Sequence, residues 1–317
     1  MMRICKLFSI SICASGLLVA QDKPAEPAPF GPVELPNTAA LYQQLLRSNA
    51  EGIGKFYMGR QISHVMGHLG ATWLERPERE REENTSKMIE SLNLRPGNQV
   101  ADIGVGSGYI ARLISKVILH GTVHGVDISP QMLKYLDANM TAADITNVKG
   151  HLGTITDPKL PPNSMDFVIM VDVYHEFDHP YEMMSGIVKA LKPRTHHTVE
   201  DGDTIGSIAK DYNMSLLRVM QINEGLKLNS KELTSGTKIL IPGGRVAFVE
   251  YNGEDPKVPI KRLHKMTEAQ VIKEASLFPI KHVETYGPPT EESKGKRNLP
   301  WQNVIFFEKT EVGKEDK

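Results

Sequence analysis

Hydrophobic and polar positions over residues 99–309 follow two alternating patterns. Short runs that are apolar almost throughout predict buried strands at 99–103, 122–126, 165–173 and 245–251. Between and after these runs, apolar residues at helical spacing predict helices at 109–119, 130–139, 180–191 and 268–277. Two further strands are expected at 282–286 and 303–309. Apolar strands separated by helices are typical of an α/β protein with a mostly parallel sheet that helices cover on both faces.

The segment before the first strand, residues 39–95, has a different pattern. Over residues 41–73 the apolar positions recur at helical spacing with several interrupting glycines, which predicts short, kinked helices. The charged run over residues 75–83 predicts a solvent-exposed helix with ion pairs four residues apart, leading into a helix through Ile89 and Leu92. We therefore expect a helical cap at 39–95.

Residues 194–242 interrupt the alternation with an order of their own. A strand at 197–200 is followed by two short helices and a closing strand at 238–241, which predicts a small βααβ unit. In its first helix, Ile205, Ile208, Ala209 and Tyr212 fall on one face. Antiparallel outer strands leave the two ends side by side, so a host loop can accept such a unit. Without residues 194–242, the flanking residues would form a short Lys-Pro-Gly-Gly turn. This indicates a domain insertion, either natural or engineered.

The N-terminus resembles an export signal. Arg3 and Lys6 precede an apolar run over residues 7–20 that is shorter than the roughly 20 residues of a membrane-spanning helix. This predicts a signal peptide at 1–20, a proline-rich tether at 21–38 and a periplasmic or secreted, possibly cell-wall-associated, protein without a stable transmembrane span; the alternative is an uncleaved anchor. Residues 310–317 form a charged tail.

Net charge and cysteine content restrict the possible binding partners and catalytic groups. The formal net charge of −1 gives no overall reason to expect a nucleic-acid partner or an anionic membrane surface. The chain's two cysteines, Cys5 and Cys13, lie within the predicted signal peptide. A cysteine nucleophile, a cysteine-bound zinc and a disulfide are therefore excluded for the processed chain.

A glycine-rich turn follows the first buried strand at Gly104, Gly106 and Gly108 and opens the next helix. Glycine permits close approach of a ligand to the backbone, and a helix N-terminus offers unpaired N–H groups. Asp127 ends the following strand, where a carboxylate can accept hydrogen bonds from both ribose hydroxyls. Because Gly106-x-Gly108-x-x-Ala111 also fits a dinucleotide pattern, a nicotinamide cofactor is an alternative.

Other motifs decide between these cofactors. Asp102 lies at the tip of the first strand, Asp172-Val173-Tyr174-His175-Glu176-Phe177 ends the fourth, and Lys192-Pro193 and Gly243-Gly244 flank the insertion. In this order they resemble class I S-adenosylmethionine-dependent methyltransferases over residues 39–193 and 243–309. The resemblance implies a Rossmann-like sheet of seven strands, mostly parallel with the last strand antiparallel, and S-adenosyl-L-methionine as cofactor.

The resemblance also implies the cofactor site. Asp102 would help hold the amino group, Asp127 the ribose, and Asp157 the adenine amino group, although Asp157 is equally well a turn residue before Pro158. The full implied set is Asp102, Gly104, Gly106, Gly108, Asp127, Ile128, Asp157 and Asp172.

Methyl transfer is an in-line displacement that needs a positioned acceptor and, for a protonated acceptor, a base. The candidates for catalysis are Tyr174, His175 and Glu176, with His175 as base and Glu176 as its orienting partner. Alternatively, Glu176 contacts the region of the cofactor's methionine carboxylate through water, and Tyr174 and His175 only shape the cofactor pocket. Tyr57, Arg60, His64 and His68 in the cap are candidates for the substrate side. His64 and His68 lack the glutamate of an H-E-x-x-H motif, so we expect no metal site.

Residues 197–242 resemble a LysM domain. The opening T-V-x-x-G-D-T-x-x-x-I-A, Asn223 and the closing G-x-x-I-x-I-P carry the resemblance. It implies binding of a glycan that contains N-acetylglucosamine, such as peptidoglycan or chitin, in a shallow groove; the alternative is a spacer. The implied groove residues are Gly202, Asp203, Thr204, Ile205, Asn223, Gly225, Leu226 and Lys227.

The sequence therefore favours an exported methyltransferase that acts on an unidentified small-molecule or envelope acceptor and carries a glycan-binding module. The alternative is a catalytically inert, methyltransferase-like scaffold that serves as a cell-wall glycan-binding protein.

Overall fold

The computed structural model describes residues 38–45, 48–223, 225–226, 233–288, 299–311 and 313. These residues belong to one compact unit that begins at Asn37. The predicted signal peptide, nearly all of the predicted tether, Lys227 and most of the charged tail lie outside the described residues.

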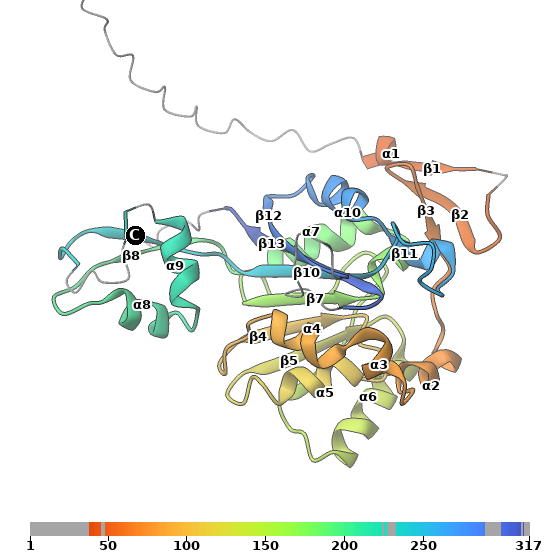
Figure 1. The fold of residues 1–317 in the computed structure, drawn as a ribbon, viewed down its shortest axis with the longest axis horizontal. Helices are drawn as coiled ribbons and strands as arrows, with labels where there is room; N and C mark the ends of the chain where they lie inside the picture. The colour runs from red at the N-terminus through yellow and green to blue at the C-terminus, as the bar shows by residue number, and fades with distance from the viewer. Residues whose placement is uncertain are drawn as a thin grey trace, which may run out of the picture. The chain divides into compact units, whose positions relative to one another are not determined.

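A central sheet forms the host domain (Figure 1). Its strand order is β12 (Ile280–Tyr286), β13 (Gln302–Lys309), β10 (Arg245–Asn252), β7 (Phe167–Val171), β4 (Gln99–Ile103), β5 (Thr122–Asp127) and β6 (Val148–Leu152). The short β11 (Lys265–Met266) pairs in parallel with β10. The path is parallel except that β13 runs antiparallel to both β10 and β12. The predicted mostly parallel, Rossmann-like sheet with an antiparallel last strand is confirmed.

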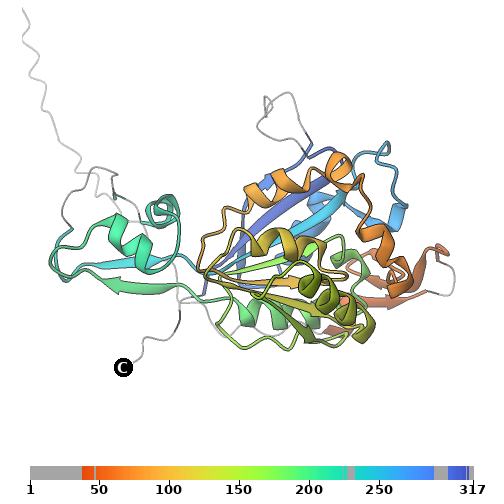
Figure 2. The ribbon, with the colours of Figure 1, turned by 90° about the horizontal axis from the view of Figure 1, so that it is seen from below.

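Helices cover both faces of this sheet (Figures 1 and 2). One face carries α7 (Pro180–Ala190) and α10 (Glu268–Ala275), and the other carries α4 (Thr85–Ser91), α5 (Tyr109–Ser115) and α6 (Pro130–Ala142). Strand residues alternate between the two cores: Val168 and Met170 of β7 face the first set of helices, whereas Phe167 and Ile169 face the second. Two-sided burial explains why the strands are apolar throughout.

The N-terminal segment is not the predicted helical cap. Between α1 (Thr38–Leu41) and the short turns η1 (His68–Gly70) and α2 (Ala71–Leu74), it forms an antiparallel sheet of β1 (Tyr42–Gln44), β2 (Gly52–Tyr57) and β3 (Arg60–Ser63). Met58 and Gly59, with φ of +50° and +93°, form the two-residue turn between β2 and β3. A hairpin turn with two positive φ angles favours glycine, so this glycine marks a turn and not a helix kink.

The charged run is also less exposed than its sequence predicts. In α3 (Arg79–Glu83), Arg79 and Glu83 are 4% and 0% exposed, and Arg79 Nε donates a hydrogen bond of 2.7 Å to Glu83 Oε2. Arg76 Nη2 and the Tyr251 hydroxyl both donate to Glu83 Oε1, at 2.5 and 2.9 Å. The prediction of a solvated helix is wrong here because α3 packs against Tyr251 of β10, a contact that spacing along the chain does not reveal.

The inserted unit has the predicted βααβ order: β8 (Thr195–Thr198), α8 (Ile205–Asp211), α9 (Leu216–Ile222) and β9 (Lys238–Ile241). It has a core of its own, formed by Val199, Ile205, Ile208, Ala209, Val219, Ile239 and Ile241. Its outer strands pair antiparallel, with Thr195 opposite Ile241. The two connections to the host therefore leave the unit side by side, as an insertion requires.

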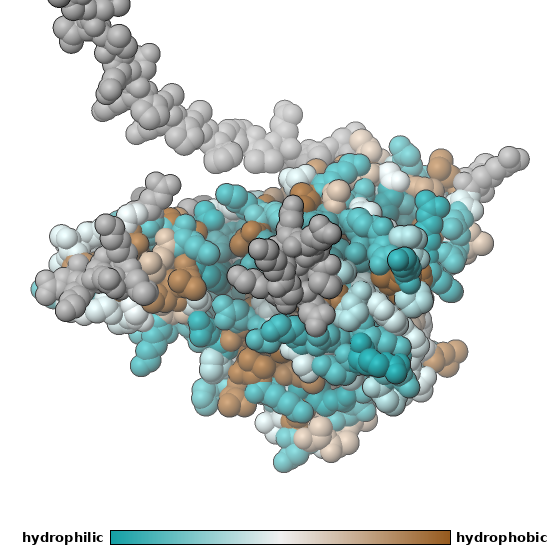
Figure 3. All heavy atoms as spheres, in the orientation of Figure 1, coloured by the Kyte–Doolittle hydropathy of each residue, from teal (hydrophilic) through white to brown (hydrophobic). Residues whose placement is uncertain are grey.

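Among the described residues, no helix is both long and apolar enough to cross a bilayer. Figure 3 shows a mostly hydrophilic face, with apolar side chains gathered in a few places such as over α9.

Candidate functional site

A cavity of about 880 Å³ lies at the carboxyl end of β4, β5 and β7. The chain runs outward from β4 to β5 and β6 on one side and continues with β7 and β10 on the other. Such a point of reversal is where open α/β sheets bind ligands. The cavity wall combines the glycine turn, Asp127, the loop after β7, the segment after β3 and the loop that ends in η3 (Arg262–His264).

The glycine turn depends on glycine at three positions. Gly104, Gly106 and Gly108 have φ of +73°, +54° and +88°, a region that residues with a Cβ rarely adopt. A Cβ on Gly104 would lie 2.4 Å from Val173 Cγ2, and one on Gly106 would lie 2.7 Å from Leu74 Cδ1. Gly104 and Gly106 line the cavity, whereas Gly108 caps α5 behind it.

Asp127 ends β5 on the cavity wall. Its Oδ2 accepts a hydrogen bond of 3.0 Å from the Gly106 N–H, and its Oδ1 accepts one of 2.8 Å from the Ser129 N–H. Burial raises the pKa of this carboxyl, while these backbone donors lower it. The neighbouring Ile128, 42% exposed, also lines the cavity.

Two buried carboxylates each keep one oxygen without a hydrogen-bond partner among the described residues: Asp102 Oδ2 and Asp172 Oδ1. Asp172 lies on the cavity wall and accepts a hydrogen bond of 2.7 Å from Gln302 Nε2. Asp102 lies behind the glycine turn, where burial raises its pKa to about 7 against the lowering effect of Arg79. Unpaired carboxylate oxygens suit a ligand with a positive charge.

Asp157 does not reach the cavity wall. It lies in an exposed turn, where its Oδ2 pairs with Lys159 Nζ at 2.9 Å. The nearby Ile155, half exposed, lines the cavity instead. The structure thus favours the alternative, a turn residue before Pro158.

The three candidates for catalysis form the short turn η2 (Tyr174–Glu176). Tyr174 points into the host core, where its ring centroid lies 4.8 Å from that of Phe248. His175 and Glu176 line the cavity. Tyr174 is therefore a packing residue, and two of the three candidates line the cavity.

The partner that orients His175 is Glu250, not Glu176. Glu250 of β10 is fully buried, and its Oε2 lies 2.5 Å from His175 Nδ1. Glu176 Oε1 lies 3.9 Å from His175 Nε2 and accepts a hydrogen bond of 3.1 Å from the Met66 N–H. A glutamate within the otherwise apolar run 246–251 is the sequence signal that could have revealed this pair.

Burial is the main influence on the pKa values of His175, Glu176 and Glu250. It lowers the pKa of His175 to about 4 and raises that of Glu176 to about 7 and that of Glu250 to about 8. The His175 imidazole is therefore neutral at neutral pH, and its Nε2 faces the cavity side.

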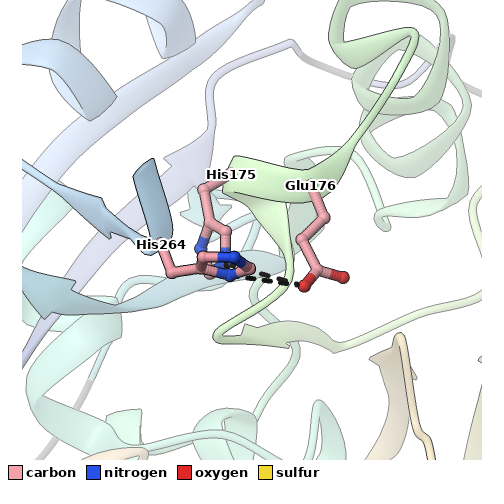
Figure 4. Close-up of side chains that lie close together, drawn as sticks. All are labelled: His175, Glu176 and His264. Carbon is pink, nitrogen blue, oxygen red and sulfur yellow. Dashed lines mark hydrogen bonds and ion pairs between the residues drawn. The ribbon is translucent and has the colours of Figure 1, made fainter. Parts of the chain in front are cut away.

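His264, at the end of η3, lies beside His175 and Glu176, and no sequence motif points to it. Its Nδ1 lies 3.2 Å from His175 Nε2 and 3.6 Å from Glu176 Oε1 (Figure 4). His264 lines the same cavity.

The four candidates for the substrate side divide into two pairs. His64 and His68 line the cavity. His64 follows β3 and His68 begins η1, so the two do not lie on one of the helices predicted for residues 41–73. Tyr57 is fully buried and lies off the cavity. Arg60 donates to both carboxylate oxygens of Glu274, at 2.8 and 3.1 Å, and to the His175 carbonyl at 3.1 Å. Arg60 therefore fixes the η2 turn.

Several of the implied groove residues in the inserted unit stabilise its fold. Thr204 caps α8 by accepting from the Ser207 N–H at 3.0 Å, Ile205 is buried, and Asp203 Oδ2 lies 2.9 Å from His197 Nε2. The Asn223 amide bonds to both the N–H and the carbonyl of Leu240. Gly202 and Gly225 have open space on their Cβ side, and Leu226 is half-buried.

Comparisons with known proteins agree with this geometry. Residues 100–194 match the family model of a methyltransferase domain, and residues 197–242 match that of a LysM domain. Over 106 residues the chain is 29% identical to a protein-L-isoaspartate O-methyltransferase of Pyrococcus horikoshii, covering 33% of this chain and 45% of that protein. Over 157 residues it is 24% identical to a tRNA (adenine(58)-N(1))-methyltransferase of Thermus thermophilus, covering 48% and 60%.

The chain thus spans about half the length of the curated relatives it matches. Among solved structures, a SAM dependent methyltransferase from Aquifex aeolicus superposes with a TM-score of 0.56 at 15% identity, covering 77% of this chain and 99% of that one. This likeness shows the fold.

Proposed function

Because residues 100–194 form a methyltransferase domain and residues 197–242 a LysM domain, we propose that this protein transfers a methyl group from S-adenosylmethionine to an acceptor bound in the large cavity. The observation that carries the proposal is the cavity at the reversal point of the sheet, walled by the glycine turn and Asp127.

The residues at the cavity fit this cofactor. Gly104 and Gly106 expose backbone to the cavity, and the Asp127 carboxylate can exchange its backbone donors for ribose hydroxyls. The unpaired Oδ1 of Asp172 on the cavity wall can accept a hydrogen bond from an ammonium group, and Asp102, behind the glycine turn, adds negative charge near the ligand when it is ionised. When bound, the cofactor supplies an electrophilic methyl group. The protein then has to hold the acceptor in line with it and exclude water.

The acceptor would lie against His64, His68, His175 and Glu176, which line the cavity beyond the glycine turn. Glu250 and Arg60 hold His175 in place, through its Nδ1 and its carbonyl. This fixed polar corner favours turnover over the alternative of an inert scaffold, because a scaffold has no need for a buried, oriented imidazole.

Incubation with cofactor that carries a radiolabelled methyl group, together with an envelope extract, tests the proposal. We expect label in a product that the wild-type protein forms and the Asp127→Ala variant does not. Titration calorimetry that detects no binding at millimolar cofactor would instead support the inert scaffold.

Cofactor affinity is expected to rise with pH. The pKa of Asp102 is raised to about 7, so its carboxylate is mostly protonated at pH 6 and mostly ionised at pH 7.5. An ionised carboxylate attracts the cationic cofactor, and we expect roughly five-fold tighter binding across this interval. Titration calorimetry at both pH values measures it. Glu176 on the cavity wall, whose pKa is also raised to about 7, titrates over the same interval. Asp102→Asn and Glu176→Gln should each lose part of this dependence, and an unchanged slope in Asp102→Asn would refute the role of Asp102.

We further propose that the processed chain is exported and that the LysM domain binds a glycan containing N-acetylglucosamine. LysM domains are typically extracellular or associated with cell walls, and the sequence of residues 1–20 supports export. Gly202 and Gly225 leave open backbone in the two loops that the family uses. We propose domain bounds of 39–193 and 243–309 for the methyltransferase and 194–242 for the LysM domain.

Deletion of residues 194–242 is expected to abolish retention on peptidoglycan. Pro193 can join Gly243 because β8 and β9 begin and end side by side, and the LysM core is separate from the host cores. Co-sedimentation with purified peptidoglycan measures the effect. The deletion variant should keep its cofactor affinity, which serves as the control for folding. Equal sedimentation of both proteins would refute glycan binding by this domain.

A further inference from the structure

His175, Glu176 and His264 form a cluster of possible metal ligands that the proposed function does not require. Among the described residues, this is the one group of three histidine or acidic side chains whose ligand atoms lie within 4.8 Å of one another. The three come from two separate turns, η2 and η3, and all three line the cavity. Figure 4 shows the two imidazoles and the carboxylate converging.

We propose that His175 Nε2, His264 Nδ1 and Glu176 Oε1 bind a divalent transition metal ion such as Zn²⁺. Their separations are 3.2 Å between the nitrogens, 3.6 Å from His264 to the carboxylate oxygen and 3.9 Å from His175 to it. Zinc bonds of about 2.1 Å at tetrahedral angles place ligand atoms about 3.4 Å apart. The observed triangle already approximates that spacing, so small side-chain rotations would complete it.

The surroundings of His175 support the same assignment. Metal-binding histidines commonly donate their other ring N–H to a carboxylate, which leaves the coordinating nitrogen free of hydrogen. Glu250 Oε2, 2.5 Å from His175 Nδ1, occupies that position and is fully buried. Because burial raises the pKa of Glu250, metal binding at Nε2 would release one proton from this pair and leave Glu250 as the carboxylate that accepts the Nδ1–H. The nearby Arg60 guanidinium is paired with Glu274 through two hydrogen bonds, which offsets its repulsion of a cation.

The ligand set also leaves coordination positions open. Two imidazoles and one carboxylate make three protein ligands, the number typical of catalytic zinc, with remaining positions for water or substrate. Because the three residues line the cavity, an open position would face it.

If the proposed function holds, an open metal position restricts the acceptor to one with a hydroxyl or thiol group that the metal can ionise. For a hydroxyl acceptor, the metal ion lowers the pKa of the bound hydroxyl, which releases its proton to solvent. The oxygen then forms a bond to the methyl carbon, the carbon–sulfur bond breaks, and its electron pair stays on sulfur in S-adenosylhomocysteine.

Equilibrium dialysis of the untagged protein against Zn²⁺, with zinc measured by plasma mass spectrometry, tests the site without cofactor or acceptor. We expect one zinc ion per wild-type chain. His264→Ala and Glu176→Gln should weaken binding at least 100-fold, and Glu250→Gln should weaken it 10- to 100-fold. Co²⁺ should give a visible ligand-field absorption in the wild type that His264→Ala lacks.

His68→Ala is the matched control, because His68 lines the same cavity outside the triangle and its replacement should leave zinc binding unchanged. The pair His124 and His151, with ring nitrogens 3.0 Å apart on β5 and β6, is the competing histidine site. Binding that survives His264→Ala and Glu176→Gln, or that is lost in His151→Ala, would overturn the proposal, as would absence of zinc at micromolar free metal. Melting curves of each variant verify its folding.

The two proposals fail separately. Cofactor binding without zinc would remove the metal and leave the methyltransferase, whereas zinc binding without cofactor would remove the methyltransferase and leave the metal site.

Discussion

Asp127→Ala is expected to weaken binding of S-adenosylmethionine by roughly 30-fold, since hydrogen bonds to a charged group contribute about 2 kcal/mol. The Asp127 carboxylate is the acidic group at the end of β5 that lines the cavity, and it already holds the Gly106 N–H of the glycine turn. Its removal takes away both a ligand contact and a support of the turn. Titration calorimetry measures the change.

Two further variants make this result interpretable. Asp127→Asn keeps one acceptor oxygen and should fall between the wild type and the alanine variant. Asp157→Ala removes an acid of the same type from an exposed turn outside the cavity, where it pairs with Lys159, and should leave affinity unchanged. If Asp157→Ala were the more damaging of the two, the cofactor would lie elsewhere than proposed.

Glu83→Ala is expected to lower the free energy of unfolding by about 3 kcal/mol or more, because removing one partner of a buried ion pair leaves the other charge uncompensated. Glu83 is fully buried and accepts hydrogen bonds from Arg76, Arg79 and the Tyr251 hydroxyl. Arg79 is 4% exposed and would keep its charge without this carboxylate. Urea denaturation followed by circular dichroism gives the value.

Arg81→Ala provides the comparison on the same helix. The Arg81 side chain is 78% exposed and lies 3.9 Å from Glu82, so its loss should change stability by less than about 0.5 kcal/mol. Equal destabilisation by both substitutions would show that α3 is held by its helical structure and not by the buried ion network.

The sheet could be predicted because most of its strands are buried on both faces. Each such strand is a continuous apolar run in the sequence. The exception is β6 (Val148–Leu152), an edge strand with exposed Lys149 and Gly150, which has no such run and was not predicted. Residues 41–73 were predicted wrongly because hairpin turns and helix kinks both place glycines among apolar residues.

The site was predictable only where it follows the ends of strands. Asp127, His175 and Glu176 are found from local sequence, because parallel strands end at one edge of the sheet. Glu250 and His264 reach the same corner from positions 75 and 89 residues beyond His175. Local spacing does not show that these residues meet His175; the charged Glu250 within an apolar strand is a sequence sign of a buried partner, and His264 has no such sign.

The adjacent ends of the LysM domain, where Thr195 pairs with Ile241, also affect the thermodynamics of the host. While residues 194–242 are unfolded they form a long loop, and closing it costs about 2 kcal/mol more chain entropy than closing a four-residue turn. Once the insert has folded, its two ends are held together, so the host folds without this loop-closure cost. A glycan that stabilises the insert would therefore raise the melting temperature of a domain it never touches.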